Sequence, residues 1–281
     1  MKIVFISDFT LAELPYGGGA EFNDQQLTIS LQDRGLEVEY FKSLNFTEKA
    51  WEKNRNNLMV ISNFLHLSEK VKSLIQKNSK YIIYEHDHKY LKNRNPLFFK
   101  NFEAPKTQIR NYDFYKESKY VFCQSSFHKK IVDRNLKTNN TFNVSGNLWK
   151  KDDLVFIKNL SETVEKKDIC SIMDSPLWNK NMKGAIEYCS KNNIAHELIA
   201  DKNYHNFLKK MCFGKKFIFL PKSPETLSRV CVEAKMLGCG VYTNNLVGAK
   251  HEDWFKAPGN DIISYMMNID KKIVNKITEV I

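Results

Sequence analysis

The sequence predicts an α/β protein made of two Rossmann-like domains, and three observations lead to this prediction. Short apolar stretches rich in β-branched and aromatic residues alternate with stretches of helical period in both halves of the chain. The length of 281 residues suits two compact domains. A Gly-Asn pair at 146–147 follows the first series of units, so the predicted domains are residues 1–149 and 150–281.

The composition is that of a globular protein, with 42% hydrophobic and 12% aromatic residues. No run of eighteen apolar residues occurs, so no transmembrane segment is expected. The residues from Met1 to Asp8 form too short an apolar run for a signal peptide. Six cysteines show no C-x-x-C spacing and mostly lie in apolar patterns, which predicts reduced core residues in a cytoplasmic protein without a metal site.

The net charge is +11, and it reflects both the overall composition and one basic segment. Abundant Lys, Asn, Ile and Phe indicate a compositional bias, which weakens any inference from the total. Locally, Lys89–Arg110 holds six basic residues and one acid, interleaved with phenylalanines. This spacing would suit binding to an anionic surface, through phosphate contacts and base stacking. The usual packing of phenylalanines at such spacing favours instead a solvated loop over an apolar patch.

The first strand, Lys2–Ser7, leads through a loop to three glycines at 17–19 and a helix over Glu21–Arg34. Glycine and the amides of a helix N-terminus let an anion or a sugar approach the backbone closely, although three glycines can also simply turn the chain. The loop lacks the G-x-G-x-x-G spacing of dinucleotide sites. Later elements of this half are strands Glu37–Phe41, Leu58–Ser62, Tyr81–Tyr84, Tyr120–Gln124 and Phe142–Ser145, and a helix Leu67–Lys77.

Titratable side chains gather directly after the predicted strand Tyr81–Tyr84, in the run Glu85-His86-Asp87-His88. A histidine beside carboxylates can accept a proton or orient a substrate hydroxyl. A hydrogen-bonded loop cluster explains the run equally well. The sequence therefore leaves both interpretations open at this strand end.

The second half repeats the alternation. Polar residues from about 150 to 167 carry linker and helix signals. The expected strands are Cys170–Met173, Ala195–Ala200 and Lys216–Leu220. The expected helices are Asn203–Met211, Ile262–Asn268 and Lys271–Ile281. The segment Phe217–Gly248 reads as strand, helix and strand, with the helix starting near Glu225 and ending at Leu237. Glu225 and Glu233 would then lie on similar sides of this helix, facing a ligand or solvent.

Several segments, in order, resemble retaining glycosyltransferases of family 4, which have the GT-B fold. Pro-Glu-Thr-Leu-Ser, Val-Glu-Ala-Lys-Met-Leu-Gly-Cys-Gly-Val and Asn-Asn-Leu-Val-Gly, all within Phe217–Gly248, are similar to the E-x7-E segment of that family. Gly-Gly-Ala-Glu at 18–21, His-Asp at 86–87, Ser-x-Phe-His ending at 128 and Lys-Gly at 183–184 also match. The resemblance implies two Rossmann-like domains facing a central cleft.

The resemblance also implies roles for individual residues. Glu233 would bind the ribose hydroxyls of a nucleotide sugar, and Glu225, with the amides that follow it, would hold the sugar and diphosphate. His86 and Asp87 would face the acceptor, with His88 as a competitor for that position. The remaining donor-side residues implied in this way are Gly18, Gly19, Lys180, Lys183, Thr226, Leu227 and Ser228. The family usually has Arg or Lys where this chain has Leu177, and it needs no metal or other cofactor.

The implied function is retaining transfer of a sugar from a UDP- or GDP-sugar to a hydroxyl of a glycan or glycolipid precursor. A DNA acceptor with hydroxylated bases, as in phage enzymes, is an alternative suited to the compact size and the basic first domain. Leu177 and the altered Thr226-Leu227-Ser228 stretch favour another alternative, a catalytically silent nucleotide-sugar-binding protein. A sugar-nucleotide epimerase of the same fold is a fourth possibility.

Overall fold

The computed structural model describes residues 2–10 and 18–281, which form two compact units. The first unit contains the described residues up to Leu148 together with Ile269–Ile281, and the second contains Trp149–Asn268. The sequence places its expected division after residue 149. Residues 269–281, which were expected in the second domain, belong to the first unit.

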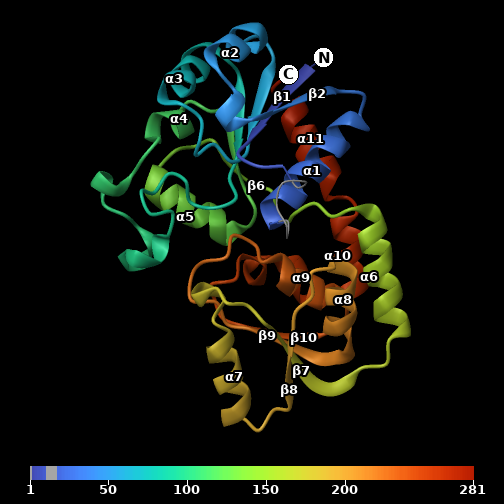
Figure 1. The fold of residues 1–281 in the computed structure, drawn as a ribbon. Helices are drawn as coiled ribbons and strands as arrows, with labels where there is room; N and C mark the ends of the chain where they lie inside the picture. Colours follow the sequence, from blue (N-terminus) through green and yellow to red (C-terminus); the bar gives the residue numbers. More distant parts are fainter. Residues whose placement is uncertain (1, 11–17) are drawn as a thin grey trace. The chain divides into compact units, whose positions relative to one another are not determined.

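The first unit is built on a six-stranded parallel sheet with the order β2-β1-β3-β4-β5-β6 (Figure 1). Most of the central strands are buried along their whole length, as is usual when helices cover both faces of a parallel sheet. The strands are β1 (Lys2–Ser7), β2 (Glu37–Lys42), β3 (Leu58–Ile61), β4 (Tyr81–Tyr84), β5 (Tyr120–Cys123) and β6 (Thr141–Asn143).

Helices cover both faces of this sheet. The strand order reverses after β2, so right-handed crossovers place α1 on one face and α2 to α5 on the other, and α11 contacts α1. The helices are α1 (Gly19–Gln32), α2 (Glu48–Asn54), α3 (Glu69–Asn78), α4 (Tyr112–Lys116), α5 (Ser126–Leu136) and α11 (Ile269–Thr278). The sequence pattern predicts neither α2 nor α4, because seven and five residues are too few to show a helical period.

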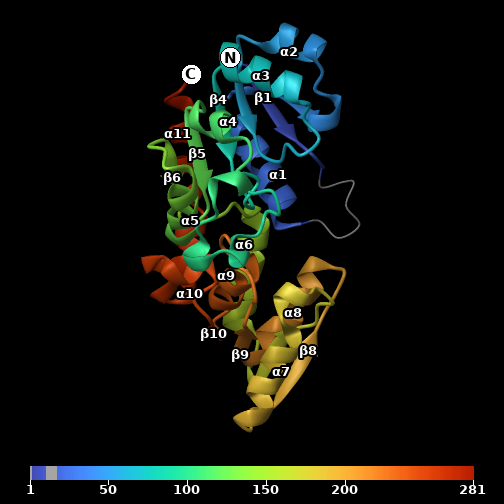
Figure 2. The same cartoon turned by 90° about the vertical axis from the view of Figure 1, so that its left-hand side faces the viewer.

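Helix α11 belongs to the first unit because it packs beside β5 and β6 (Figure 2). The ammonium of Lys276 lies 4.4 Å from the centre of the Tyr120 ring, and that of Lys272 lies 5.3 Å from the Phe142 ring. Lys272 also donates a hydrogen bond to the carbonyl of Val144. These contacts are cation–π and hydrogen-bonding interactions that the apolar period of the tail does not reveal.

The second unit is a four-stranded parallel sheet with the order β10-β9-β7-β8. Helix α7 covers one face, and α6, α8, α9 and α10 pack together on the other (Figure 1). The strands are β7 (Lys167–Met173), β8 (His196–Ile199), β9 (Gly214–Phe219) and β10 (Gly240–Thr243). The helices are α6 (Lys151–Thr163), α7 (Met182–Lys191), α8 (Tyr204–Phe213), α9 (Arg229–Met236) and α10 (Gly259–Met266).

All six cysteines are buried and free, as the sequence predicts: Cys123, Cys170, Cys189, Cys212, Cys231 and Cys239. Burial raises the pKa of Cys231 to about 12, so its thiol is a neutral core group at physiological pH. Across residues 2–10 and 18–281, the helices are all too short or too polar to cross a bilayer.

The expected helix start at Glu225 is wrong. Helix α9 begins at Arg229, after Ser228 in a left-handed conformation with φ of 75°. Glu225 instead forms an isolated parallel bridge with Val247, because its N–H donates to the carbonyl of Leu246 and its carbonyl accepts from Gly248. Glu225 and Glu233 therefore do not share a helix face.

Candidate functional site

Parallel strands end at one edge of their sheet, and ligands of open α/β sheets bind outside that edge. In the first unit this edge carries Ser7 and Asp8 after β1, the run 85–89 after β4, and Gln124 after β5. Ser125 caps the helix that follows, since its hydroxyl accepts from the N–H of His128 at 3.1 Å. The fold therefore brings the titratable run into contact with the ends of its neighbouring strands.

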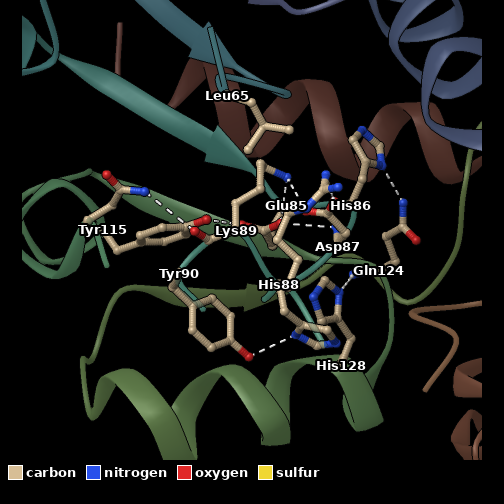
Figure 3. Close-up of polar contacts among 12 residues, drawn as sticks. Leu65, Glu85, His86, Asp87, His88, Lys89, Tyr90, Tyr115, Gln124 and His128 are labelled. Carbon is tan, nitrogen blue, oxygen red and sulfur yellow. Dashed lines mark hydrogen bonds and ion pairs between the residues drawn. The ribbon is translucent and has the colours of Figure 1, made fainter. Parts of the chain in front are cut away.

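His86 is held through both of its ring nitrogens. Nε2 lies 2.8 Å from Oδ1 of Asp24, and Nδ1 lies 2.6 Å from the side-chain nitrogen of Gln124 (Figure 3 shows the second contact). If the Gln124 amide donates to Nδ1, then Nε2 carries the proton and donates to the carboxylate. The side chain is 5% exposed. His86 is thus a fixed imidazole, and its use as a base requires that one of these bonds break.

Asp24 is a candidate site residue that the sequence analysis missed. It lies on α1, is 2% exposed, and also accepts from the hydroxyl of Ser7 at 3.0 Å. It lines a cavity of about 260 Å³ together with Glu21, Phe9 and Tyr40. The structure reveals its role, because α1 buries polar residues, which a helix covering only an apolar core does not do.

The glycine loop meets this cavity only in part. Gly18 is the N-cap of α1 and Gly19 its first residue, and an added Cβ at Gly18 would collide with the Glu21 carboxylate. The remainder of the predicted loop, residues 11–17, lies outside the described residues. The carboxylate of Glu21, in the first turn of α1, would repel an anion at this end of the helix.

A buried ion network lies beneath His86 (Figure 3). The ammonium of Lys89 is 2.6 Å from Glu85 and 3.0 Å from Asp87, and Tyr115 donates a short hydrogen bond to Glu85. Burial raises the pKa of Glu85 despite the nearby ammonium. Burial also acts to raise the pKa of Asp87, but Lys89 and Arg94 outweigh it and lower that pKa to about 2.

Asp87 is therefore an ionised partner of Lys89 and Arg94. This places the carboxylate in a structural network, although the side chain is 39% exposed.

His88, the alternative to His86, is buried in a different place. Its Nδ1 is 2.8 Å from the hydroxyl of Tyr90, and its ring stands edge-on to that of His128 at 5.1 Å. Burial lowers the pKa of His88 to about 4 and that of His128 well below its ordinary value, so both rings are neutral at physiological pH. His88 is 3% exposed and does not face the cavity lined by Asp24.

In the second unit, the loops after β7 and β9 meet through Lys180 and Glu225. The ammonium lies 2.8 and 3.0 Å from the two carboxylate oxygens. Asn181, in a left-handed conformation, donates to the carbonyl of Leu220 at 2.8 Å and so fixes the start of α7 against the end of β9. The predicted donor residues Lys180 and Glu225 are thus brought together as an ion pair.

The other predicted donor residues differ in their accessibility. Lys183 is exposed on the first turn of α7, and Leu177 and Trp178 are exposed just before it. Leu227 is fully buried in the core, so only its backbone could face a ligand. Thr226 is half-buried, and Ser228 is buried with its positive φ.

Glu233 lies on α9 and is 4% exposed. Its Oε1 accepts from Nε1 of Trp149 at 3.0 Å and from the hydroxyl of Tyr204 at 2.8 Å. The guanidinium of Arg229 stacks 4.1 Å from the Trp149 ring centre, and its Nε lies 3.7 Å from the same Oε1. A buried carboxylate is thus fixed by three side chains through one oxygen. The sequence analysis identified Glu233 but neither aromatic donor.

Across residues 2–10 and 18–281, three or more His, Cys, Asp or Glu side chains nowhere gather in a metal-binding arrangement.

No known family model matches the chain. A search of curated proteins likewise finds no match.

The structure resembles several solved glycosyltransferase structures. Anabaena Alr3699/HepE in complex with UDP and glucose gives a TM-score of 0.59 at 13% identity, over 99% of both chains. The lipopolysaccharide outer core galactosyltransferase WaaB gives 0.58 at 11% identity, over 100% of both chains. The catalytic domain of starch synthase IV from Arabidopsis thaliana, bound to ADP and acarbose, gives 0.55 at 8% identity, over 99% of this chain and 94% of that one. The fold of this protein is therefore GT-B, as the sequence predicts.

Proposed function

We propose that this protein is a retaining glycosyltransferase similar to family 4, which transfers a sugar from a UDP- or GDP-sugar to a hydroxyl of a glycan or glycolipid precursor. The observation that carries the proposal is the fixed, buried carboxylate of Glu233. Its three contacts converge on Oε1, so Oε2 is the oxygen available to accept from ribose hydroxyls. A buried carboxylate oxygen is stabilised by a hydrogen-bond donor, and the two hydroxyls of a ribose diol can supply one.

On the donor side, Lys180 and Lys183 would neutralise the diphosphate. Negative charge grows on the leaving oxygen during glycosyl transfer, and a fixed cation stabilises it. Lys183 is exposed on the first turn of α7, whose amides add to its charge. The ammonium of Lys180 would leave its ion pair with Glu225 and bind the phosphate instead. The released Glu225 carboxylate could then accept hydrogen bonds from the sugar hydroxyls.

On the acceptor side, the cavity lined by Asp24 suits a sugar ring. Carboxylates of Glu21 and Asp24 can accept from hydroxyls, and the rings of Phe9 and Tyr40 can pack on the C–H face of a sugar. His86 would orient this wall through Asp24, and Gly18 and Gly19 would border it. Asp87 would act through Lys89, by holding the turn that carries His86.

The bonding of His86 favours a retaining mechanism. Because both ring nitrogens are engaged, the acceptor proton has a better destination in the oxygen of the departing diphosphate. That proton transfer occurs on the face from which the leaving group departs, and it yields a product with the donor's anomeric configuration.

Titration calorimetry with UDP, GDP and ADP, followed by mass spectrometry of products from the matching sugar donors, tests the proposal. Glu233→Gln should weaken nucleotide binding at least tenfold, whereas Glu187→Gln, an exposed glutamate on α7, should leave it unchanged. Proton NMR of the product should show the anomer of the donor. If all three nucleotides fail to bind, or Glu233→Gln binds them as wild type does, the proposal is wrong.

The same experiment separates the alternatives. Binding without transfer, with Leu177→Arg creating activity, identifies a silent nucleotide-sugar-binding protein. Transfer only to DNA containing hydroxymethylated bases identifies a DNA glycosyltransferase. A changed monosaccharide without any acceptor identifies an epimerase.

A further inference from the structure

A second cavity of about 630 Å³ lies within the first unit, between residues 103–112 and the end of helix α5. Its size is in the range of small-molecule sites, roughly 300–1,000 Å³. It shares no lining residue with the cavity beside Asp24. The proposed sugar transfer makes no use of it.

The cations of this cavity come from two distant parts of the sequence. Lys106 lies in the basic segment Lys89–Arg110, whereas Arg134 and Lys137 lie at the end of α5. With Glu103 as the one carboxylate among the described lining residues, three cations give a net charge of about +2. The cavity therefore attracts an anion.

The basic segment itself is not the uniform surface that its sequence suggests. Lys89 is fully buried between Glu85 and Asp87, and Arg94 pairs with Asp87 at 3.2 Å. Two of its six basic residues are thus neutralised at the network beneath His86. Lys106 is exposed at the cavity, where the fold adds Arg134 and Lys137 to it.

Arg134 is positioned to bind a phosphate. Its Nη1 donates to the carbonyl of Asn101 at 2.8 Å, which holds the guanidinium against the cavity wall. A guanidinium has five N–H donors, and their planar fork matches two phosphate oxygens. Lys137 is held less tightly, at 3.4 Å from Glu103.

The rest of the lining suits a ring with hydroxyl groups. Tyr112 is 41% exposed at the cavity, and the half-buried Ile109 adds apolar surface. An exposed tyrosine ring packs on the C–H face of a sugar, while the carboxylate of Glu103 can accept from its hydroxyls. This combination of cations, a ring and a carboxylate fits a sugar phosphate better than a bare anion.

The cavity wall is preformed. Asn135 accepts from the N–H of Ala104 at 2.8 Å and donates to the carbonyl of Phe102 at 2.7 Å, which ties the segment to α5. Asn101, Phe102 and Asn111 all have left-handed backbones, with φ between 53° and 62°. Such conformations persist where the surroundings fix them, and they are frequent at ligand sites. A preformed wall lowers the ordering cost of binding.

We propose that this cavity binds a sugar phosphate, with its phosphate on Arg134 and Lys106 and its ring on Tyr112. The ligand is either a free sugar phosphate or the polyol head group of a phospholipid. A nucleic acid strand fits less well, because it needs cations along an extended line and Lys89 and Arg94 are neutralised. The proposal does not depend on the proposed sugar transfer, and binding alone tests it.

Titration calorimetry with glucose 6-phosphate is the first test, with glucose and inorganic phosphate as comparison ligands. Glucose 6-phosphate should bind more tightly than either of them. The double variant Lys106→Gln/Arg134→Gln should weaken binding at least tenfold with an unchanged circular dichroism spectrum. Lys92→Gln, an exposed lysine of the same segment outside the cavity, should bind as wild type does.

Two further measurements identify the source and exclude other sites. Flotation with phosphatidylinositol vesicles, against phosphatidylcholine vesicles, tests the head-group source, and retention that needs Arg134 supports it. Lys183→Gln should leave glucose 6-phosphate binding unchanged, because that lysine belongs to the donor side. The proposal is overturned if neither glucose 6-phosphate nor phosphatidylinositol vesicles bind, or if the double variant binds them as wild type does. It is also overturned if Lys183→Gln abolishes glucose 6-phosphate binding, or if only duplex DNA binds in a way that requires Lys106 and Arg134.

Discussion

Oδ1 of Asp24 lies 2.8 Å from Nε2 of His86 and joins helix α1 to the residue that follows strand β4 by two positions. The other carboxylate oxygen accepts from Ser7 at the end of β1, and Gln124 at the end of β5 holds the opposite ring nitrogen. The ends of three strands and one helix thus converge on one buried imidazole and one carboxylate. The orientation of His86 depends on Asp24.

We expect Asp24→Ala to lower the free energy of unfolding by about 1–3 kcal/mol, since it leaves a buried imidazole N–H without its acceptor. The rate of sugar transfer should fall about tenfold, and KM for the acceptor should rise. KM for the nucleotide sugar should stay unchanged, because Lys180, Glu225 and Glu233 lie in the other unit. Urea denaturation and initial rates at varied acceptor concentration measure both effects.

Asp33→Ala is the matched control, because Asp33 is an exposed aspartate that ends the same helix. It should change neither quantity appreciably. An Asp24→Ala variant whose acceptor KM equals that of the wild type would remove Asp24 from the acceptor site.

The stability of the first unit should fall between pH 6.5 and pH 4 because of His88. Burial lowers the folded-state pKa of His88 to about 4 from the ordinary value of 6.5. Between these two pH values the unfolded chain binds a proton at His88 and the folded protein does not, so protonation favours unfolding. Each pKa unit is worth about 1.4 kcal/mol, which gives a loss of roughly 3 kcal/mol. Above pH 6.5 the contribution of His88 is complete.

Urea denaturation at pH 7, 5.5 and 4 measures this loss. His88→Gln should make the profile less steep, because glutamine does not titrate and can still bond to Tyr90, whereas the buried His128 keeps its own contribution. His66→Gln, which changes an exposed histidine of the same unit, should keep the wild-type profile. Parallel profiles for wild type and His88→Gln would contradict the assignment.

The alternation of strands and helices was predictable from sequence, because buried parallel strands are short continuous apolar runs such as Leu58–Ile61 and Tyr81–Tyr84. The start of α9 was not. Pro224 and Glu225 match a helix start locally, but a bridge to Val247 competes for their backbone and delays the helix to Arg229. That competition is tertiary, and it has no signal within the segment.

The candidate site was predictable only where one strand end supplies it. The run after β4 located His86, but its partners Asp24 and Gln124 lie 62 and 38 residues away. Lys89 was expected as a surface cation, and the adjacent carboxylates draw it into the interior instead. Spacing predicts neighbours on one element, whereas contacts between elements depend on the sheet order.

Trp149→Phe should weaken nucleotide binding about tenfold or more, since a hydrogen bond to a charged group is worth about 1.5–3 kcal/mol. Phenylalanine keeps a ring beneath Arg229 but removes the N–H that fixes Oε1 of Glu233. Titration calorimetry with ribose and 2′-deoxyribose forms of the preferred nucleotide should show that the variant discriminates less between them. Trp254→Phe, in the same unit, is the control. Equal loss for both nucleotide forms would indicate a general packing effect.

Glu225→Gln should separate binding from transfer. Lys180 is paired with both oxygens of Glu225, and this pair competes with the diphosphate for the ammonium. Without the carboxylate charge, we expect the nucleoside diphosphate to bind about threefold to tenfold more tightly, with a steeper dependence on salt because a less shielded cation meets it. The rate of transfer should fall at least tenfold, since the hydroxyls of the donor sugar lose the carboxylate to which they would donate hydrogen bonds.

Lys180→Ala should weaken diphosphate binding, and the double variant Lys180→Ala/Glu225→Gln should resemble Lys180→Ala. Calorimetry at 50 and 500 mM NaCl with initial-rate measurements checks each step, and weaker diphosphate binding by Glu225→Gln would show that Glu225 itself holds the nucleotide and does not restrain Lys180.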